Sequence, residues 1–174
     1  MVIIGLFVTM LQIKSSSNDY KNQINDLEKE LQGQREVENV VALTKEFIEK
    51  SSVGQQKDLL TGSAKEMYEK ALANKGISED EHLENESSLE DVNIINVFSE
   101  RNENNSITSY AMYQSIYEMN PNSDTEVSQR IVSFSLTATW DKTKDGYKVS
   151  DYKIDLLKDS LDDYLLKEMS ENNG

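Results

Sequence analysis

The chain has 174 residues, a formal net charge of −14 at pH 7 and no cysteine. The negative charge argues against nucleic acid as a partner, because binding phosphates requires Lys and Arg side chains, and it also disfavours lying on an anionic membrane surface. The absence of cysteine excludes disulfides, thiolate metal ligands and cysteine nucleophiles. The length fits one ordinary domain with an appendage.

Residues 1–13 are almost wholly apolar and are followed by Lys14. As a helix they would reach only about 20 Å, short of the roughly 30 Å hydrocarbon core of a bilayer. They also lack the basic start and the small-residue cleavage site of a secretory signal. We expect them to be a partial transmembrane anchor, cut from a longer apolar helix. A secretory signal and a buried core helix are the alternatives.

Residues 14–35 are polar and predict a helical stalk. Four apolar residues recur within it at spacings of four, three and four, as in a heptad repeat: Tyr20, Ile24, Leu27 and Leu31. Two heptads are too few to distinguish a coiled coil from a solvated helix, so both interpretations stay open. Gly33 is expected to weaken the helix before the next segment.

Two amphipathic helices are predicted next, and both are candidates to cover a sheet. In residues 36–50 the apolar face recurs at helical spacing and comprises Val37, Val40, Val41, Thr44, Phe47 and Ile48. The second helix begins at Ser63, which with Glu66 fits a capping box. Gly76 is its expected stop signal.

Residues 78–91 are strongly acidic and predict a solvated loop. The only histidine, His82, lies in this segment. A transition-metal site would need further imidazole or thiolate ligands, which the sequence does not offer. We therefore expect no metal and no cofactor.

Four strands are predicted after this loop, with no helix between them. The first three cover residues 92–101, 107–119 and 127–140, and the fourth begins at Tyr147. The third is the clearest, because five apolar residues alternate with Ser and Thr: Val132, Phe134, Leu136, Ala138 and Trp140. These five side chains should face the helices.

The fourth strand changes phase near Ser150, since its apolar residues lie at odd positions before that point and at even positions after it. This predicts a β-bulge, which would curl the sheet. A short amphipathic helix is expected from Leu157 to Met169. Residues 36–174 are thus predicted to form an α+β domain, with N-terminal helices packed on a curled, cone-like four-stranded antiparallel meander.

This order of elements resembles the nuclear transport factor two-like fold. With an anchor and a stalk before it, the layout resembles the membrane-anchored inner-membrane scaffold proteins of type IV secretion systems, including those of Gram-positive conjugative plasmids. The resemblance covers roughly residues 36–158 plus the anchor and rests on no motif. It implies a non-enzymatic bacterial protein, single-pass in the cell membrane, whose extracytoplasmic domain forms oligomers and binds other secretion or conjugation components.

The second strand is the expected interaction surface. Tyr110, Met112 and Ile116 share one face of it, and Ala111, Tyr113 and Tyr117 share the other. A sheet covered by helices on one side buries only one of these sets, and aromatic residues and Met are enriched at the centres of interfaces. The interface candidates are therefore Tyr110, Met112, Ile116, Tyr113 and Tyr117.

A small-molecule-binding or isomerase-like enzyme of the same cone fold is the alternative. Its pocket would need a carboxylate base and a hydrogen-bond donor such as Tyr. The candidates are Tyr110, Tyr113, Tyr117 and Tyr152 as donors, with Asp151 or Asp155 as the base. We favour the interpretation that these tyrosines only pack, and we assign no catalytic residue.

Overall fold

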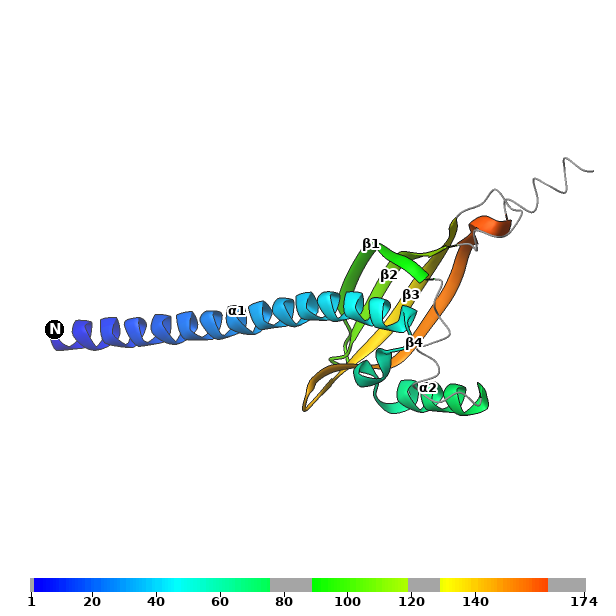
Figure 1. The fold of residues 1–174 in the computed structure, drawn as a ribbon. Coiled ribbons are helices and arrows are strands. Elements are labelled where there is room, and N and C mark those ends of the chain that lie inside the picture. The colour runs from blue at the N-terminus through cyan, green and yellow to red at the C-terminus, as the bar shows by residue number, and fades with distance from the viewer. Residues whose placement is uncertain (1, 76–88, 119–128, 163–174) are drawn as a thin grey trace, which may run out of the picture. The chain divides into compact units, whose positions relative to one another are not determined.

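The computed structural model describes residues 2–75, 89–118 and 129–162, except for the side chains of residues 2–18 and 75. The chain divides into unit 1, Met1–Glu38, and unit 2, Asn39–Gly174. The elements are α1 (Val2–Ser52), the 3-10 helix η1 (Gln56–Leu59), α2 (Gly62–Lys75), β1 (Leu89–Arg101), β2 (Ile107–Glu118), β3 (Gln129–Thr143) and β4 (Gly146–Asp159) (Figure 1).

Unit 2 is built on one antiparallel sheet whose strands lie in chain order, β1-β2-β3-β4. β2 and β3 pair without a register shift, so Tyr113 lies opposite Phe134 and Ile107 opposite Trp140. The outer pairs contain register shifts, for example at Ile95 in β1. The fold is therefore α+β, with helices followed by a curled four-stranded antiparallel sheet, as the sequence predicts.

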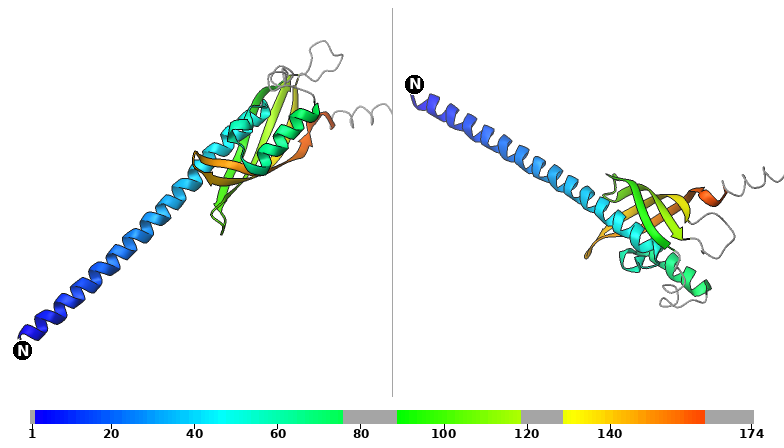
Figure 2. Two further views of the ribbon diagram at one scale, coloured as in Figure 1. Left: turned by 90° about the horizontal axis from the view of Figure 1, so that it is seen from below. Right: turned by 45° about the horizontal axis from the view of Figure 1, so that its top comes forward.

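One face of this sheet, called the inner face below, packs against the helices. Ile107, Leu136, Ala138 and Trp140 lie on it and are almost completely buried. Residues 39–52 of α1 lie across this face, as the two further views show (Figure 2). They contribute a fully buried stripe at helical spacing, namely Val40, Thr44, Phe47 and Ile48. The predicted core faces of α1 and β3 are confirmed, although Val37, Val41 and Phe134 are only partly buried.

The predicted bulge in β4 is confirmed at Ser150. Thr139 lies opposite Asp151, but the next residue, Trp140, lies opposite Val149, so Ser150 is an extra residue in β4. The bulge keeps Val149 on the inner face and moves Tyr152 onto that face as well. A second shift between Ser133 and Phe134 occurs near the end of β4.

The start of α2 is attached to β4 at the first bulge. The Thr61 N–H donates a hydrogen bond to the Val149 carbonyl (2.8 Å), and the Ser63 hydroxyl donates to the Ser150 carbonyl (2.8 Å). The Lys148 ammonium group donates to the Asp58 carbonyl. The predicted capping box is therefore wrong, because α2 begins at Gly62 and Ser63 hydrogen-bonds to the strand.

Two other boundaries differ from the sequence prediction. Gly33 does not interrupt α1, which is continuous from Val2 to Ser52. β4 continues to Asp159, so Leu157 is in a strand and helical structure begins only at Ser160. The rest of the predicted C-terminal helix lies outside the described residues, as does most of the acidic segment with His82. Among the described residues, no helix is both long enough and apolar enough to cross a membrane.

Candidate interaction surface

The outer face of the sheet is the face turned away from α1. Along β2, the odd-numbered residues from Ile107 to Ser115 are buried and the even-numbered ones are not. Met112 is 47% exposed on this outer face. Phe98 of β1 lies opposite Tyr110 of β2. Their rings stack with centroids 4.9 Å apart, although Phe98 is 54% exposed.

These three residues, Phe98, Tyr110 and Met112, form the outer patch. The Tyr110 hydroxyl donates a hydrogen bond to the Glu100 carboxylate (3.2 Å). Partial burial, and then this hydrogen bond, raise the pKa of Tyr110 above its usual value. The stacked rings are thus held in one arrangement while much of their surface remains in water, an arrangement typical of binding surfaces.

Charge on the outer face changes from one edge of the sheet to the other. β4 presents charges of alternating sign to solvent, and the facing residues of β3 are mainly hydroxyls: Ser133, Ser135, Thr137 and Thr139. The exposed charged residues of β1 and β2 that lie on the outer face are all acidic: Asp91, Glu100 and Glu118. Of these three, Glu100 hydrogen-bonds to Tyr110, whereas Asp91 and Glu118 lie farther along the strands beside Ile116.

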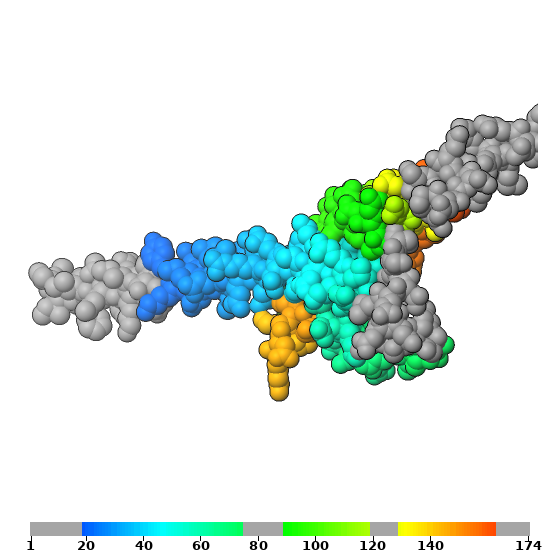
Figure 3. Space-filling model, viewed as in Figure 1, coloured from blue at the N-terminus to red at the C-terminus, as the bar shows by residue number. Residues whose placement is uncertain are grey.

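The two edges of the sheet also differ. β4 is covered near Val149 by residues 60–63, with a parallel bridge between Leu60 and Val149. β1 has only β2 as a neighbouring strand among the described residues, and it lies at the surface of unit 2 in the space-filling view (Figure 3). An open edge offers backbone N–H and C=O groups to another chain.

The five interface candidates separate onto the two faces. Tyr110, Met112 and Ile116 lie on the outer face, whereas Tyr113 and Tyr117 lie on the inner face. Tyr113 stacks on Phe134 with centroids 5.3 Å apart and is only 4% exposed. Burial, with a smaller contribution from Tyr117, raises the pKa of Tyr113 to about 12. Tyr113 is therefore a core residue.

The carboxylates predicted for the alternative enzyme lie on the outer face in β4, and of its predicted tyrosines only Tyr110, two strands away in β2, shares that face. Asp151 and Asp155 lie opposite Thr139 and Ser135 and are exposed on the outer face. Tyr152 points to the other face, where its ring meets Phe47 edge to face at 5.3 Å. Burial raises the pKa of Tyr152, and a hydrogen bond from Gln56 partly opposes this. The bulge at Ser150 places Tyr152 on the inner face, so Tyr152 cannot pair with the carboxylates of Asp151 and Asp155.

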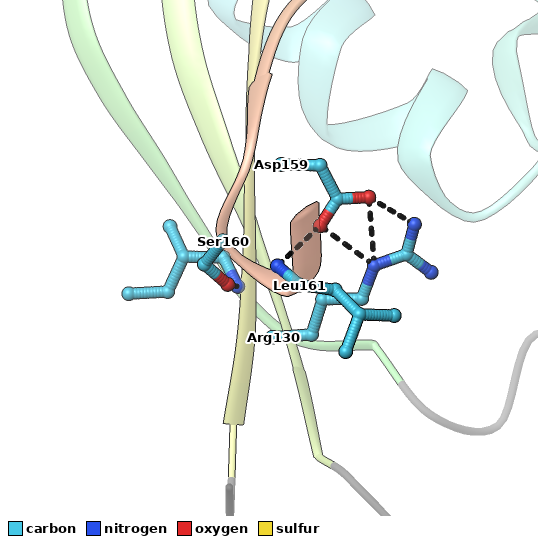
Figure 4. A network of polar contacts seen from close by, with 5 residues as sticks. Arg130, Asp159, Ser160 and Leu161 are labelled. Atoms are coloured by element: carbon cyan, nitrogen blue, oxygen red, sulfur yellow. Dashed lines mark hydrogen bonds and ion pairs between the residues drawn. The ribbon is translucent and has the colours of Figure 1, made fainter. Parts of the chain in front are cut away.

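An ion pair between Arg130 and Asp159 was not predicted from the sequence (Figure 4). Arg130 Nε lies 3.0 Å from both carboxylate oxygens, and its NH2 group contacts one of them. The same carboxylate accepts a hydrogen bond from the Leu161 N–H (3.0 Å), while the Ser160 hydroxyl accepts one from the Ile131 N–H (2.9 Å). The hydrogen bonds from Arg130 hold the pKa of Asp159 below its usual value.

This cluster ties the end of β4 to the beginning of β3, but it does not resemble a catalytic or metal site. The charges of Arg130 and Asp159 pair with each other, and Asp159 and Ser160 accept backbone hydrogen bonds from Leu161 and Ile131. Within the described ranges, no group of three or more His, Cys, Asp or Glu side chains is arranged to hold a metal ion. Comparisons of the chain with protein-family models, curated proteins and solved structures find no match.

Proposed function

We propose that this chain is a non-enzymatic scaffold protein of a bacterial secretion or conjugative transfer apparatus. In this proposal residues 1–13 belong to a single-pass anchor in the cell membrane, and residues 36–174 form an extracytoplasmic domain of the nuclear transport factor two-like type. The domain acts by binding other components of the apparatus and further copies of itself. The observation that carries the proposal is the outer patch, a partly exposed apolar surface beside β1, which has no second neighbouring strand among the described residues.

The chemistry of the outer patch defines the partner surface that would fit it. The stacked rings of Phe98 and Tyr110 and the flexible side chain of Met112 favour an apolar contact. The Glu100 carboxylate beside the patch, with Asp91 and Glu118 farther along the same two strands, favours Lys or Arg at the rim of the partner. The expected partner is therefore a protein segment with apolar residues at its centre and basic residues at its border. The edge of β1 could align an extended segment of this kind.

The isomerase-like alternative has no comparable support. Tyr113, Tyr117 and Tyr152 lie on the face opposite to the predicted bases Asp151 and Asp155, and Tyr110 shares their face but lies two strands away. Of the tyrosines on the inner face, Tyr152 contacts the ring of Phe47 and Tyr113 that of Phe134.

Partner capture from the native host tests the proposal. Met112→Lys places a positive charge in the outer patch and should repel a partner with a basic rim, so the co-purifying secretion or conjugation components should be lost. Asp151→Lys also adds a lysine to the outer face, but two strands away, and should leave capture intact. If both variants capture the same proteins as the parent chain, the outer patch is not the binding surface.

A protease experiment tests the location separately. Protease added to intact protoplasts should digest residues 15–174, and a cytoplasmic marker protein should survive in the same sample. If the chain is degraded only after lysis, the extracytoplasmic placement is wrong.

A further inference from the structure

The stalk carries an apolar stripe that unit 1 does not cover. Tyr20 is 65% exposed, Ile24 54%, Leu27 63% and Leu31 48%. All other residues from 19 to 30 are exposed too, and every one of them is polar or charged. A helix with this pattern gains stability chiefly when its apolar stripe packs against another surface.

The spacing of this stripe identifies the kind of surface that would cover it. With Ile24 and Leu31 at heptad position a, Tyr20 and Leu27 fall at position d. Side chains at a and d pack into the spaces between a and d side chains of an identical helix. The stripe is therefore complementary to itself.

Charges beside the stripe support the same partner. Glu30 is at position g and Arg35 at position e of the next heptad. In a parallel two-stranded coiled coil these positions from opposite helices are neighbours, so each Glu30 would face Arg35 of the other copy. Neither residue has an ion-pair partner within the described part of the chain, and both are exposed.

We infer that residues 20–35 form a parallel, in-register, two-stranded coiled coil with a second copy of this chain. We infer a second copy as the partner because the same apolar stripe can form both sides of the contact. In such a pair the Glu30–Arg35 contact between the two helices also forms twice. The parallel orientation rests on the proposed function, which attaches residues 1–13 of both copies to the same membrane. An antiparallel pair would instead bring Lys21 next to Glu28.

Disulfide trapping distinguishes these arrangements, because the 174-residue chain contains no cysteine to interfere. In the parallel pair, residue 20 of one copy faces residue 20 of the other, so Tyr20→Cys should form an interchain disulfide under mild oxidation. In an antiparallel pair, residue 20 faces residue 31, and the two residues 20 are separated by about 16 Å along the axis. This separation is too great for a disulfide. Asn22→Cys, on the outside of the coil, is the matched control and should stay reduced.

Exchange of the two charges gives an independent test of orientation. Glu30→Arg alone and Arg35→Glu alone should each weaken self-association in sedimentation measurements on the full chain. The double variant restores opposite charges at the facing positions of a parallel pair and should recover the dimer. In an antiparallel pair, the two residues do not face each other and no recovery is expected.

Each outcome has a defined meaning. Self-linking of Tyr20→Cys together with recovery in the double variant supports the parallel coiled coil. Linking only in a mixture of Tyr20→Cys and Leu31→Cys chains shows an antiparallel pair and overturns the inference. A monomer that does not cross-link also overturns it. The outer patch can still bind its partner in that case, so the capture experiment decides the proposed function separately.

Discussion

Phe47 of α1 meets Trp140 of β3 edge to face, with ring centroids 6.3 Å apart and an interplanar angle of 80°. Both side chains are fully buried. The second edge-to-face contact of Phe47, with Tyr152 of β4, joins the helix to a neighbouring strand. Because Ser150 is an extra residue between Val149 and Asp151, Tyr152 reaches the same face as Trp140. One helix side chain therefore connects two strands, and the bulge makes this contact possible.

Trp140→Ala should lower the free energy of unfolding by about 3–5 kcal/mol, because it removes a large buried ring and leaves a cavity against Phe47. Trp140→Phe is the matched control. The indole Nε1 has no hydrogen-bond partner among the described residues, so replacement by Phe breaks no hydrogen bond and should cost less. Denaturant unfolding measures both variants. A loss below about 1 kcal/mol for the alanine variant would show that Trp140 is not a core residue.

The second prediction concerns a buried chain of hydroxyls that links α1 to the sheet. The Thr44 hydroxyl lies 2.8 Å from the Val40 carbonyl and 2.8 Å from Ser109 Oγ, which in turn lies 2.9 Å from Ser99 Oγ. Thr44→Val preserves the shape but removes the central hydroxyl. It should cost about 1–3 kcal/mol, because the buried Ser109 hydroxyl loses a partner.

Thr44→Ser keeps the hydroxyl and is the control for this prediction. The double variant Thr44→Val with Ser109→Ala should lower the free energy of unfolding by less than the sum of the two single changes. In the double variant both hydroxyls are removed, so neither is left buried without its partner. Strict additivity in denaturant unfolding would mean that the two hydroxyls do not interact.

The central strands could be predicted from the sequence because their side chains alternate strictly. In β3 the parity of Val132 to Trp140 determines the inner face, and the buried residues agree with it. The bulge was predictable for the same reason, since a change of parity within β4 requires an extra residue. The sequence also showed that Tyr110 and Tyr113 lie on opposite faces, although it did not show which of the two faces is covered.

Features that depend on contacts distant in the chain were not predictable from local patterns. The sequence around Ser63 matches the capping-box pattern, but the Ser63 hydroxyl donates its hydrogen bond to the carbonyl of Ser150, 87 residues away. The pairing of Arg130 with Asp159 depends on the second register shift in β4, where no change of apolar parity is visible. The Phe98–Tyr110 stack likewise depends on strand register, because Ile95 shifts the pairing of β1 with β2.

The third prediction concerns stability at acidic pH. Arg130 lowers the pKa of Asp159 below its ordinary value of 3.8, so the folded state favours the ionised carboxylate. The stabilisation is complete well above pH 3.8 and is lost as the pH falls through the lower, folded-state pKa. Asp159→Asn should therefore lower stability at neutral pH and reduce the further loss on acidification. Asp151→Asn removes an exposed carboxylate and is the control. An unchanged acid profile for Asp159→Asn would contradict the linkage.

The fourth prediction concerns stability at alkaline pH. The pKa of Tyr113 is raised from 10.0 to about 12, mainly by burial, so the folded state favours the neutral phenol. This contribution is fully present below pH 10 and is lost as the pH rises toward 12. Tyr113→Phe keeps the ring against Phe134 and should flatten the alkaline decline in stability. Absorbance titration of the phenolate in the parent chain should show one late-ionising tyrosine that is missing in the variant. If both titrate alike, Tyr113 is not shielded.

The last prediction compares two adjacent residues of β2 that point to opposite faces. Met112 is 47% exposed in the outer patch, whereas Ala111 is 5% exposed against the core. Met112→Glu leaves its charge in water and should change the free energy of unfolding by less than about 1 kcal/mol. Ala111→Glu must bury a carboxylate without a partner, so it should unfold the domain or shift the carboxylate pKa strongly upward. Circular dichroism and denaturant unfolding of the two variants measure the difference.

A stable Met112→Glu domain would show that the outer patch is not needed for folding. This result is expected if the patch serves to bind a partner. Equal destabilisation by both variants would mean that the outer face is covered within the chain, and the proposed binding surface would then be wrong.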